Sequence, residues 1–114
     1  MAVTTTHLPL IDDAGFAAAV APGTGLVAVD FTADWCPPCR MMAPVLDAAA
    51  AELGDVRFVA IDSDANPQST VRHNVRGLPT LLVFKDGALV DRIIGAVPLA
   101  TIRERIGRHR PATP

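Results

Sequence analysis

One stretch of the sequence decides the fold: Leu26-Val-Ala-Val-Asp30-Phe-Thr-Ala-Asp-Trp35-Cys36-Pro-Pro-Cys39-Arg40. Its first half, Leu26–Thr32, is a nearly continuous apolar run, which is typical of a strand covered by helices on both faces. From Cys36 to Leu53 apolar residues recur at helical spacing, and Gly54 follows as a stop. The stretch therefore predicts a buried strand that passes directly into a long amphipathic helix.

Downstream of this helix, strand and helix patterns alternate. Val56–Ile61 is a further apolar run and predicts a second buried strand. Asn66-Pro67 is typical of a helix start, because asparagine caps helices well and proline is tolerated at the first helical position. This short helix should end near His73, with Asn74 in a left-handed conformation.

The C-terminal part of the sequence predicts a β-hairpin and a last helix. Residues 80–84 and 88–94 read as strands, and Lys85-Asp86-Gly87 between them favours a tight turn, so the two strands should be antiparallel neighbours. Pro98 then opens a helix that should end near Gly107. Residues 109–114 should form a frayed tail.

At the N-terminal end, residues 5–10 predict an edge strand, followed by a helix that Asp12 or Asp13 would cap. The element order is β-α-β-α-β-α-β-β-α, which predicts an α/β fold with parallel strands joined by right-handed crossovers and an antiparallel hairpin added at the end. We expect a single domain over residues 1–108, because no repeat or linker interrupts the pattern.

Composition and charge exclude several classes of partner. The chain has 114 residues, with 10 Lys+Arg against 12 Asp+Glu, and Lys85 is its only lysine. No basic block is present that could neutralise a run of phosphates or lipid headgroups, so we expect neither nucleic acid nor membrane as a partner. The N-terminus shows no export signal, and no stretch stays apolar for the ~18 residues of a membrane span. These features predict a soluble, cytoplasmic protein.

Cys36 and Cys39 are the only cysteines, and their spacing predicts thiol chemistry. A disulfide that closes so short a loop restrains the unfolded chain very little. Cys36 falls at the start of the long helix, where unpaired N–H groups and the helix dipole favour a thiolate. One helical turn further on, Cys39 should lie about 5 Å away between Cα atoms, within the range of a disulfide. A zinc half-site and a pair of inert structural thiols are the alternatives.

Several further motifs follow the cysteine pair in order: Asp64-x-Asn66-Pro67, Val75-Arg-Gly77-Leu78-Pro79-Thr80 and Gly95-Ala96. With Trp35-Cys36-x-Pro38-Cys39 they show that the chain, from Leu26 to Ile106, resembles the thioredoxin family. The resemblance implies a thioredoxin fold, in which a central mixed sheet of four to five strands is flanked by helices on both faces, with a C-terminal antiparallel hairpin plus helix. It also implies protein-disulfide reductase activity by reversible dithiol–disulfide exchange.

The resemblance also assigns roles to residues. Cys36 would be the nucleophile, Cys39 the more buried resolving thiol, and Asp30 the proton-transfer group. Pro79 would follow a cis peptide bond, and Leu78 would pair its backbone with the substrate. The substrate-binding residues implied are Trp35, Pro37, Pro38, Gly77, Leu78, Pro79, Gly95 and Ala96. Two departures from the family pattern stand beside these roles: Pro37 replaces the usual glycine between the cysteines, and Thr32 replaces an aromatic residue.

Asp30 is unusual on its own terms, because it is a carboxylate within an apolar strand. Burial should raise its pKa, since the charged form loses its hydration. Many relatives place a lysine near this carboxylate on the next strand, and that position corresponds here to Ala60. The alternative is a carboxylate that local hydrogen bonds satisfy and that has no catalytic role.

The resemblance implies no bound cofactor and no metal. Electrons would come from NADPH indirectly, through a flavoprotein thioredoxin reductase, and pass to disulfide-containing client proteins, with this chain acting as a monomer in electron transport. Asp62 and Asp64 could suggest a metal pair, but two acids before a helix start are more often solvated loop residues.

Two other functions remain as alternatives to a general disulfide reductase. One is a specialised thiol–disulfide oxidoreductase with a dedicated client or donor, and the other is a thioredoxin-fold binding module with secondary redox activity.

Overall fold

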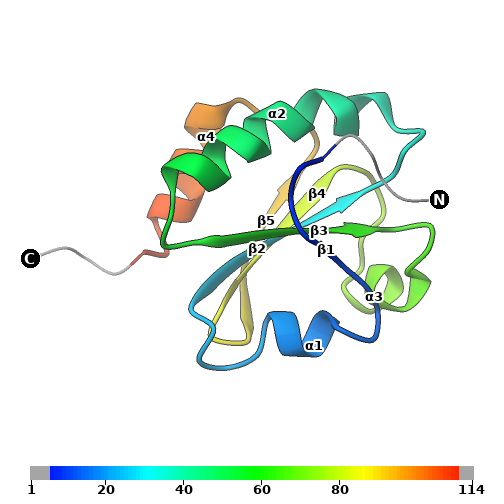
Figure 1. The fold of residues 1–114 in the computed structure, drawn as a ribbon, viewed down its shortest axis with the longest axis horizontal. Coiled ribbons are helices and arrows are strands. Elements are labelled where there is room, and N and C mark those ends of the chain that lie inside the picture. Colours follow the sequence, from blue (N-terminus) through cyan, green and yellow to red (C-terminus); the bar gives the residue numbers. More distant parts are fainter. Residues whose placement is uncertain (1–5, 111–114) are drawn as a thin grey trace, which may run out of the picture.

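The computed structural model describes residues 6–110, which form a three-layer α/β fold (Figure 1). The central sheet has five strands in the order β1-β3-β2-β4-β5. In chain order the strands are β1 (Leu10–Ile11), β2 (Leu26–Thr32), β3 (Arg57–Asp62), β4 (Thr80–Lys85) and β5 (Ala88–Ile94). The pairs β1–β3 and β2–β3 are parallel, while β2–β4 and β4–β5 are antiparallel. The predicted mixed sheet and element order are confirmed.

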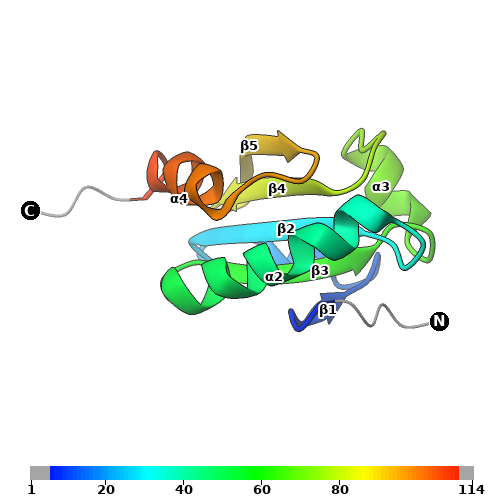
Figure 2. The same cartoon turned by 90° about the horizontal axis from the view of Figure 1, so that it is seen from above.

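Helices cover both faces of this sheet. The helices α2 (Pro37–Glu52) and α4 (Leu99–Gly107) lie on one face, and α1 (Phe16–Ala19) and α3 (Pro67–Arg72) lie on the other (Figure 1). Seen from above, α2 runs along β2 and β3, while α4 lies at one end of β4 and β5 (Figure 2). Pro44 lies inside α2, and the helix continues through it.

The central strand β2 supplies both cores, and all seven of its residues are buried. Ala28 packs with the side chains of α2 and α4, such as Leu46 and Ile102. Val29 and Phe31 belong to the opposite core, which includes Phe16. Because side chains alternate along a strand, Asp30 shares the face of Ala28 and points toward the α2 layer. The apolar run thus places one carboxylate beneath the helix that carries the cysteines.

The hairpin and the exit of α3 follow their predicted turn chemistry. Asp86 and Gly87 both have positive φ, at 49° and 91°, which is the conformation that a two-residue hairpin turn requires. Asn74 ends the α3 segment with a φ of 58°. These short-range signals were therefore read correctly from the sequence.

The N-terminal segment differs from the prediction. The edge strand is only Leu10–Ile11, and Thr5 lies outside the described residues. The first helix, α1, has Gly15 at its N-cap, with no side-chain cap. Asp12 accepts the Gly15 N–H at 2.8 Å and so closes the turn before the helix.

The carboxylate of Asp13 caps a different helix from the one expected. Its two oxygens accept the backbone N–H groups of Gln68 at 3.2 Å and Ser69 at 2.7 Å, at the start of α3. Asn66 occupies the N-cap position of α3 but makes no side-chain cap bond. Its amide oxygen instead accepts the Asp13 N–H at 2.8 Å. An anion suits a helix N-terminus better than a neutral amide, and the fold brings Asp13 within reach.

The start of the expected tail is held on the fold. His109 hydrogen-bonds through Nε2 to Asp91 Oδ2 at 3.1 Å, and its side chain is only 23% exposed. Residues 111–114 of the expected tail lie outside the described part of the chain. Within residues 6–110, none of the helices combines the length and the apolar character needed to cross a membrane.

Candidate active site

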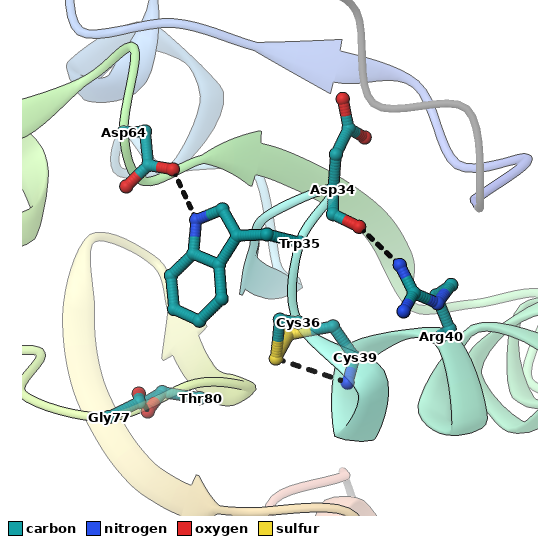
Figure 3. The surroundings of a disulfide bond; sticks show 8 residues. All are labelled: Asp34, Trp35, Cys36, Cys39, Arg40, Asp64, Gly77 and Thr80. Carbon is teal, nitrogen blue, oxygen red and sulfur yellow. Dashed lines mark hydrogen bonds between the residues drawn. A yellow bond between two sulfur atoms is a disulfide. The ribbon is translucent and has the colours of Figure 1, made fainter.

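The two cysteines form a disulfide at the start of α2 (Figure 3). Cys36 is the N-cap residue and has an extended backbone, with φ −94° and ψ 105°. This conformation is the one that the following proline imposes. The Cα atoms of Cys36 and Cys39 lie 5.2 Å apart, which confirms the expected spacing. Both residues are buried, at 3% and 2% exposure, so neither is much more buried than the other.

A backbone amide points at the sulfur of Cys36. The Cys39 N–H donates to Cys36 Sγ at 3.3 Å, as the dashed line in Figure 3 shows. Pro37 and Pro38 have no N–H to offer, so this donor is the first one in the helix. Together with the positive end of the α2 dipole, it favours a negative charge on this sulfur. The geometry is that of a cysteine whose thiolate is stabilised by a helix N-terminus.

Trp35 stands beside the disulfide and is 64% exposed. Its indole Nε1–H donates to Asp64 Oδ2 at 2.5 Å, a bond that orients the ring over the site (Figure 3). Arg40 donates to the Asp34 carbonyl at 2.5 Å and so ties the first turn of α2 to the loop before it. The sequence indicated Asp64 only as a solvated loop residue. Its role in positioning Trp35 was missed, because the two residues are 29 positions apart.

The loop before β4 lies on another side of the disulfide. The Leu78–Pro79 peptide bond is cis, as the resemblance implied. Leu78 packs against a small cluster that contains both cysteines. The Thr80 hydroxyl donates to the Gly77 carbonyl at 2.6 Å, and the Gly95 N–H donates to the Pro79 carbonyl at 2.8 Å. These contacts bring Gly77, Leu78, Pro79 and Gly95 together next to the cysteine pair.

The remaining residues expected to bind substrate are exposed around this loop and the helix start. Pro37 and Pro38 are exposed on the first turn of α2. Ala96, which follows Gly95, is exposed. The N–H of the next residue, Val97, donates to the sulfur of Met42 in α2 at 3.5 Å. The structure thus gathers the predicted surface residues around a buried disulfide.

Asp30 is buried beneath the α2 layer, with 3% exposure. Burial raises its pKa from 3.8 to about 7, because the ionised form is desolvated. Its Oδ1 has no hydrogen-bond partner among the described residues, which argues against a carboxylate satisfied by local bonds. The strand register places Ala60 and Leu81 on either side of it. The apolar side chain of Ala60 therefore adjoins Asp30 directly.

The pair Asp62 and Asp64 serves the turn after β3. Asp62 Oδ1 accepts the N–H groups of Asp64 at 3.0 Å and Ala65 at 3.4 Å. Across residues 6–110, the structure places no three His, Cys, Asp or Glu side chains where they could hold a metal ion together.

A disulfide at a helix N-terminus, next to a cis-proline loop, defines a thiol–disulfide oxidoreductase. A family model described as Thioredoxin matches residues 7–108. The chain belongs to the thioredoxin family.

Individual relatives agree with this family over most of their length. Thioredoxin 1 of Synechococcus elongatus is 42% identical over 100 residues, which cover 87% of this chain and 94% of that protein. Thioredoxin of Porphyra purpurea is 41% identical over 100 residues, with the same shares covered. Thioredoxin of Chlamydia trachomatis is 39% identical over 101 residues, or 89% of this chain and 97% of that protein. Protein-disulfide reduction fits both the family and the cysteine geometry.

Membership of this family also sets the general kind of partner. Thioredoxins act on disulfide-containing substrates, are recharged in general by a thioredoxin reductase, and need no bound cofactor. The two cysteines, at the disulfide spacing described above, are the redox group.

Proposed function

We propose that this chain reduces the disulfides of client proteins with Cys36 as the attacking thiolate, Cys39 as the resolving thiol and Asp30 as the proton-transfer group. The observation that carries this assignment is the position of Cys36 at the N-cap of α2, where its sulfur accepts the Cys39 N–H. A thiolate on Cys36 is stabilised there, whereas Cys39 lies within the helix and lacks this environment.

In the first step, the Cys36 thiolate attacks one sulfur of the client disulfide. A bond forms between Cys36 Sγ and that sulfur, the client S–S bond breaks, and the second client sulfur leaves as a thiolate that takes a proton from solvent. The product is a mixed disulfide between Cys36 and the client. The exposed Trp35 and the proline pair Pro37 and Pro38 border this sulfur.

In the second step, Cys39 resolves the mixed disulfide. The Asp30 carboxylate accepts the Cys39 proton, and the resulting thiolate attacks Cys36 Sγ. The Cys36–Cys39 bond forms while the client sulfur leaves as a thiolate, so the client gains two electrons and the cysteine pair loses two. A pKa of about 7 leaves Asp30 roughly half ionised at neutral pH, which suits a group that must take up and release a proton.

The client would lie across an apolar surface around the disulfide. The residues proposed to contact it are Trp35, Pro37, Pro38, Gly77, Leu78, Pro79, Gly95 and Ala96. Leu78 would offer its backbone to an extended client segment, because it precedes the cis-proline and packs against the cysteine cluster. Trp35, held by Asp64, would form the opposite wall.

The electron source and the compartment complete the proposal. We place the protein in the cytoplasm as a monomer in an electron-transport chain, where a flavoprotein thioredoxin reductase uses NADPH to reduce the Cys36–Cys39 disulfide. A reducing compartment keeps such a pair in its dithiol form. The two electrons released by NADPH thereby reach client disulfides, which serves cell redox homeostasis.

Trapping of the mixed disulfide tests the assignment of the two cysteines. Insulin is offered to the wild-type protein and to the C36S and C39S variants, and products are separated on non-reducing gels. We expect wild type to reduce insulin catalytically with NADPH and a thioredoxin reductase. C39S should accumulate an insulin adduct that dithiothreitol releases, and C36S should form none. An adduct on C36S but not on C39S would reverse the assignment.

A further inference from the structure

A surface groove of about 460 Å³ borders the cis-proline loop. We call it the arginine groove, and its lining residues are Asn74, Arg76, Gly77, Thr80, Arg92 and Ile94. Gly77 and Thr80 flank Leu78 and Pro79 along the chain, and Leu78 packs against the cysteine cluster. The groove therefore begins at the loop that borders the disulfide and extends away from it along β5.

The groove carries two positive charges that are not neutralised within residues 6–110. Neither Arg76 nor Arg92 takes part in any of the ion pairs found there. Asp91 precedes Arg92, but successive side chains of a strand point to opposite faces. The Asp91 carboxylate is bound instead by Arg105 and His109. The groove is thus cationic on a chain whose net charge is −2.

Both guanidinium groups are held in place by the end of the α3 segment. Arg92 donates to the carbonyls of His73 at 2.7 Å and Asn74 at 3.4 Å. Arg76 donates through Nε to the Asn74 side-chain oxygen at 3.0 Å. An arginine has five N–H donors, so these bonds orient each group and leave most donors for a ligand. Fixed arginines of this kind suit a carboxylate, because little side-chain freedom is lost on binding.

One wall of the groove is apolar. Ile94 is 68% exposed, so its aliphatic side chain is accessible to a ligand. A small inorganic anion would make no use of this wall. A polypeptide segment that carries a carboxylate next to an aliphatic part would contact both the arginines and Ile94.

The opposite side of Trp35 has the opposite charge. There a second hollow is lined by Asp34, Trp35, Asp62 and Asp64. In Figure 3, Asp64 and Gly77 lie on different sides of the indole ring. An acidic client segment would be repelled from this second, acidic hollow and attracted to the arginine groove. The negative hollow on one side of Trp35 and the positive groove on the other therefore favour one direction for a client chain that crosses the site.

We propose that the arginine groove is a specificity subsite, which receives an aspartate or glutamate side chain of the client a few residues from the cysteine under attack. This inference rests on the proposed function, because the client must place its disulfide at Cys36. The groove then selects among clients by charge, without taking part in the exchange of sulfur bonds.

Three synthetic peptides test the subsite. They share one sequence, in which a single cysteine is linked by a disulfide to a fluorescent thiol. They differ at the two positions that follow the cysteine, which are both Glu, both Gln or both Lys. A second set of three carries the same residues at the two positions that precede the cysteine. The full chain is reduced beforehand, and the second-order rate of fluorophore release is measured. The glutamate/glutamine rate ratio is compared within each variant, because it cancels any general loss of folding or thiol reactivity.

For the wild type we expect a ratio of about 5 in one of the two placements, as exposed but oriented charge pairs contribute modestly. The ratio should fall below about 2 in 0.5 M NaCl, where charges are screened. R92Q and R76Q should each reduce the ratio to about 2 or less. R76Q tests the charge separately from the fold, because the Arg76 hydrogen bond found within residues 6–110 goes to the Asn74 side chain and not to the backbone.

The matched control is R57Q, which removes one charge from an exposed arginine at the start of β3, outside both the groove and the active site. It should keep the wild-type ratio. The proposal is overturned by a wild-type ratio near 1 in both placements, or by an equal fall of the ratio in R57Q. Failure of the proposed function would look different, since none of the six peptides would then be reduced at an appreciable rate.

Discussion

Two aspartates of the sheet, one on the central strand β2 and one on the edge strand β5, have pKa values shifted in opposite directions. Asp30 on β2 is 3% exposed, its Oδ1 has no hydrogen-bond partner within residues 6–110, and burial raises its pKa to about 7. Asp91 on β5 accepts hydrogen bonds from Arg105 and His109 as well as the Arg92 N–H at 2.8 Å. The Arg105 hydrogen bond, ahead of the other contacts, lowers the Asp91 pKa to about 2.

The difference shows that the neighbouring charged groups, and not the residue type, decide whether the pKa of a buried carboxyl group is raised or lowered. Desolvation acts on both groups, but within residues 6–110 only Asp91 has cationic partners that offset it. Asp91 therefore stabilises the packing of α4 and residue 109 against β5 while it is ionised. Asp30 destabilises the fold when it ionises, and its pKa of about 7 suits the proton-transfer role proposed for it.

The largest expected effect comes from removing Asp30. Its folded pKa of about 7 lies above its unfolded value of 3.8, so the folded state holds its proton longer and stability falls as pH rises between these values. The full loss is roughly 4 kcal/mol, from about 1.4 kcal/mol per pKa unit. D30A should lack this loss. Urea unfolding of the oxidised protein at pH 4 and pH 8.5 measures the effect.

The informative quantity is the difference in unfolding free energy between D30A and wild type at each pH. It should shift in favour of D30A by several kcal/mol between pH 4 and pH 8.5, whatever the variant costs in packing. In the same variant, resolution of a mixed disulfide by Cys39 should slow at pH 7. Parallel stability curves for the two proteins would show that Asp30 has an ordinary pKa.

Removing the charge of Asp91 should act in the opposite direction and less strongly. The folded pKa lies below the unfolded value, so its contribution is present above about pH 4 and is lost as pH falls through about 2. D91N should lower the free energy of unfolding by about 2 kcal/mol at pH 7, with little effect near pH 2. Thermal or urea unfolding at both pH values checks this.

The control for Asp91 is an exposed ion pair of α4. Glu104 pairs with Arg108 at i,i+4, and both side chains are about 60% exposed. E104Q should change the unfolding free energy by only about 0.3 kcal/mol, because water screens such pairs. If E104Q and D91N destabilise the protein equally, the partial burial of the Asp91 cluster contributes nothing of its own.

Local sequence signals predicted one aspartate of this pair and not the other. Asp30 stands out because a carboxylate interrupts an apolar run, and burial of that run followed from its pattern. The role of Asp91 depends on Arg105 and His109, which are 14 and 18 residues away. His109 even fell in the segment expected to fray. No periodicity or turn motif reports on such a pairing.

The same division holds for the rest of the fold and site. The strand–helix order, the position of Cys36 at the helix start and the Asp86-Gly87 turn depend on neighbouring residues, and all were predicted. The cap of α3 by Asp13 and the bond of Trp35 to Asp64 join residues far apart in sequence, and both were missed. The cis bond before Pro79 was foreseen only through the family resemblance.

The last prediction converts Asp30 toward the behaviour of Asp91 by giving it a cation. Ala60 is the cross-strand neighbour of Asp30 on β3 and is fully buried. In A60K the ammonium group would lie close enough to favour the ionised carboxylate, and a nearby opposite charge lowers a carboxyl pKa by about one unit or more. We expect the Asp30 pKa to fall from about 7 to about 6 or below, measured by NMR titration of the carboxyl carbon in the oxidised protein.

The control is A60M, which adds a side chain of similar length without charge. It separates the charge effect from packing and should leave the Asp30 pKa at or above about 7, since it adds only burial. The pH midpoint of Cys39-dependent resolution should move with the NMR value in A60K, because the same carboxylate is proposed to accept the thiol proton. If the pH midpoint of resolution stays the same while the carboxyl pKa falls, Asp30 does not accept the thiol proton. It would then be only a buried carboxylate without a role in the exchange.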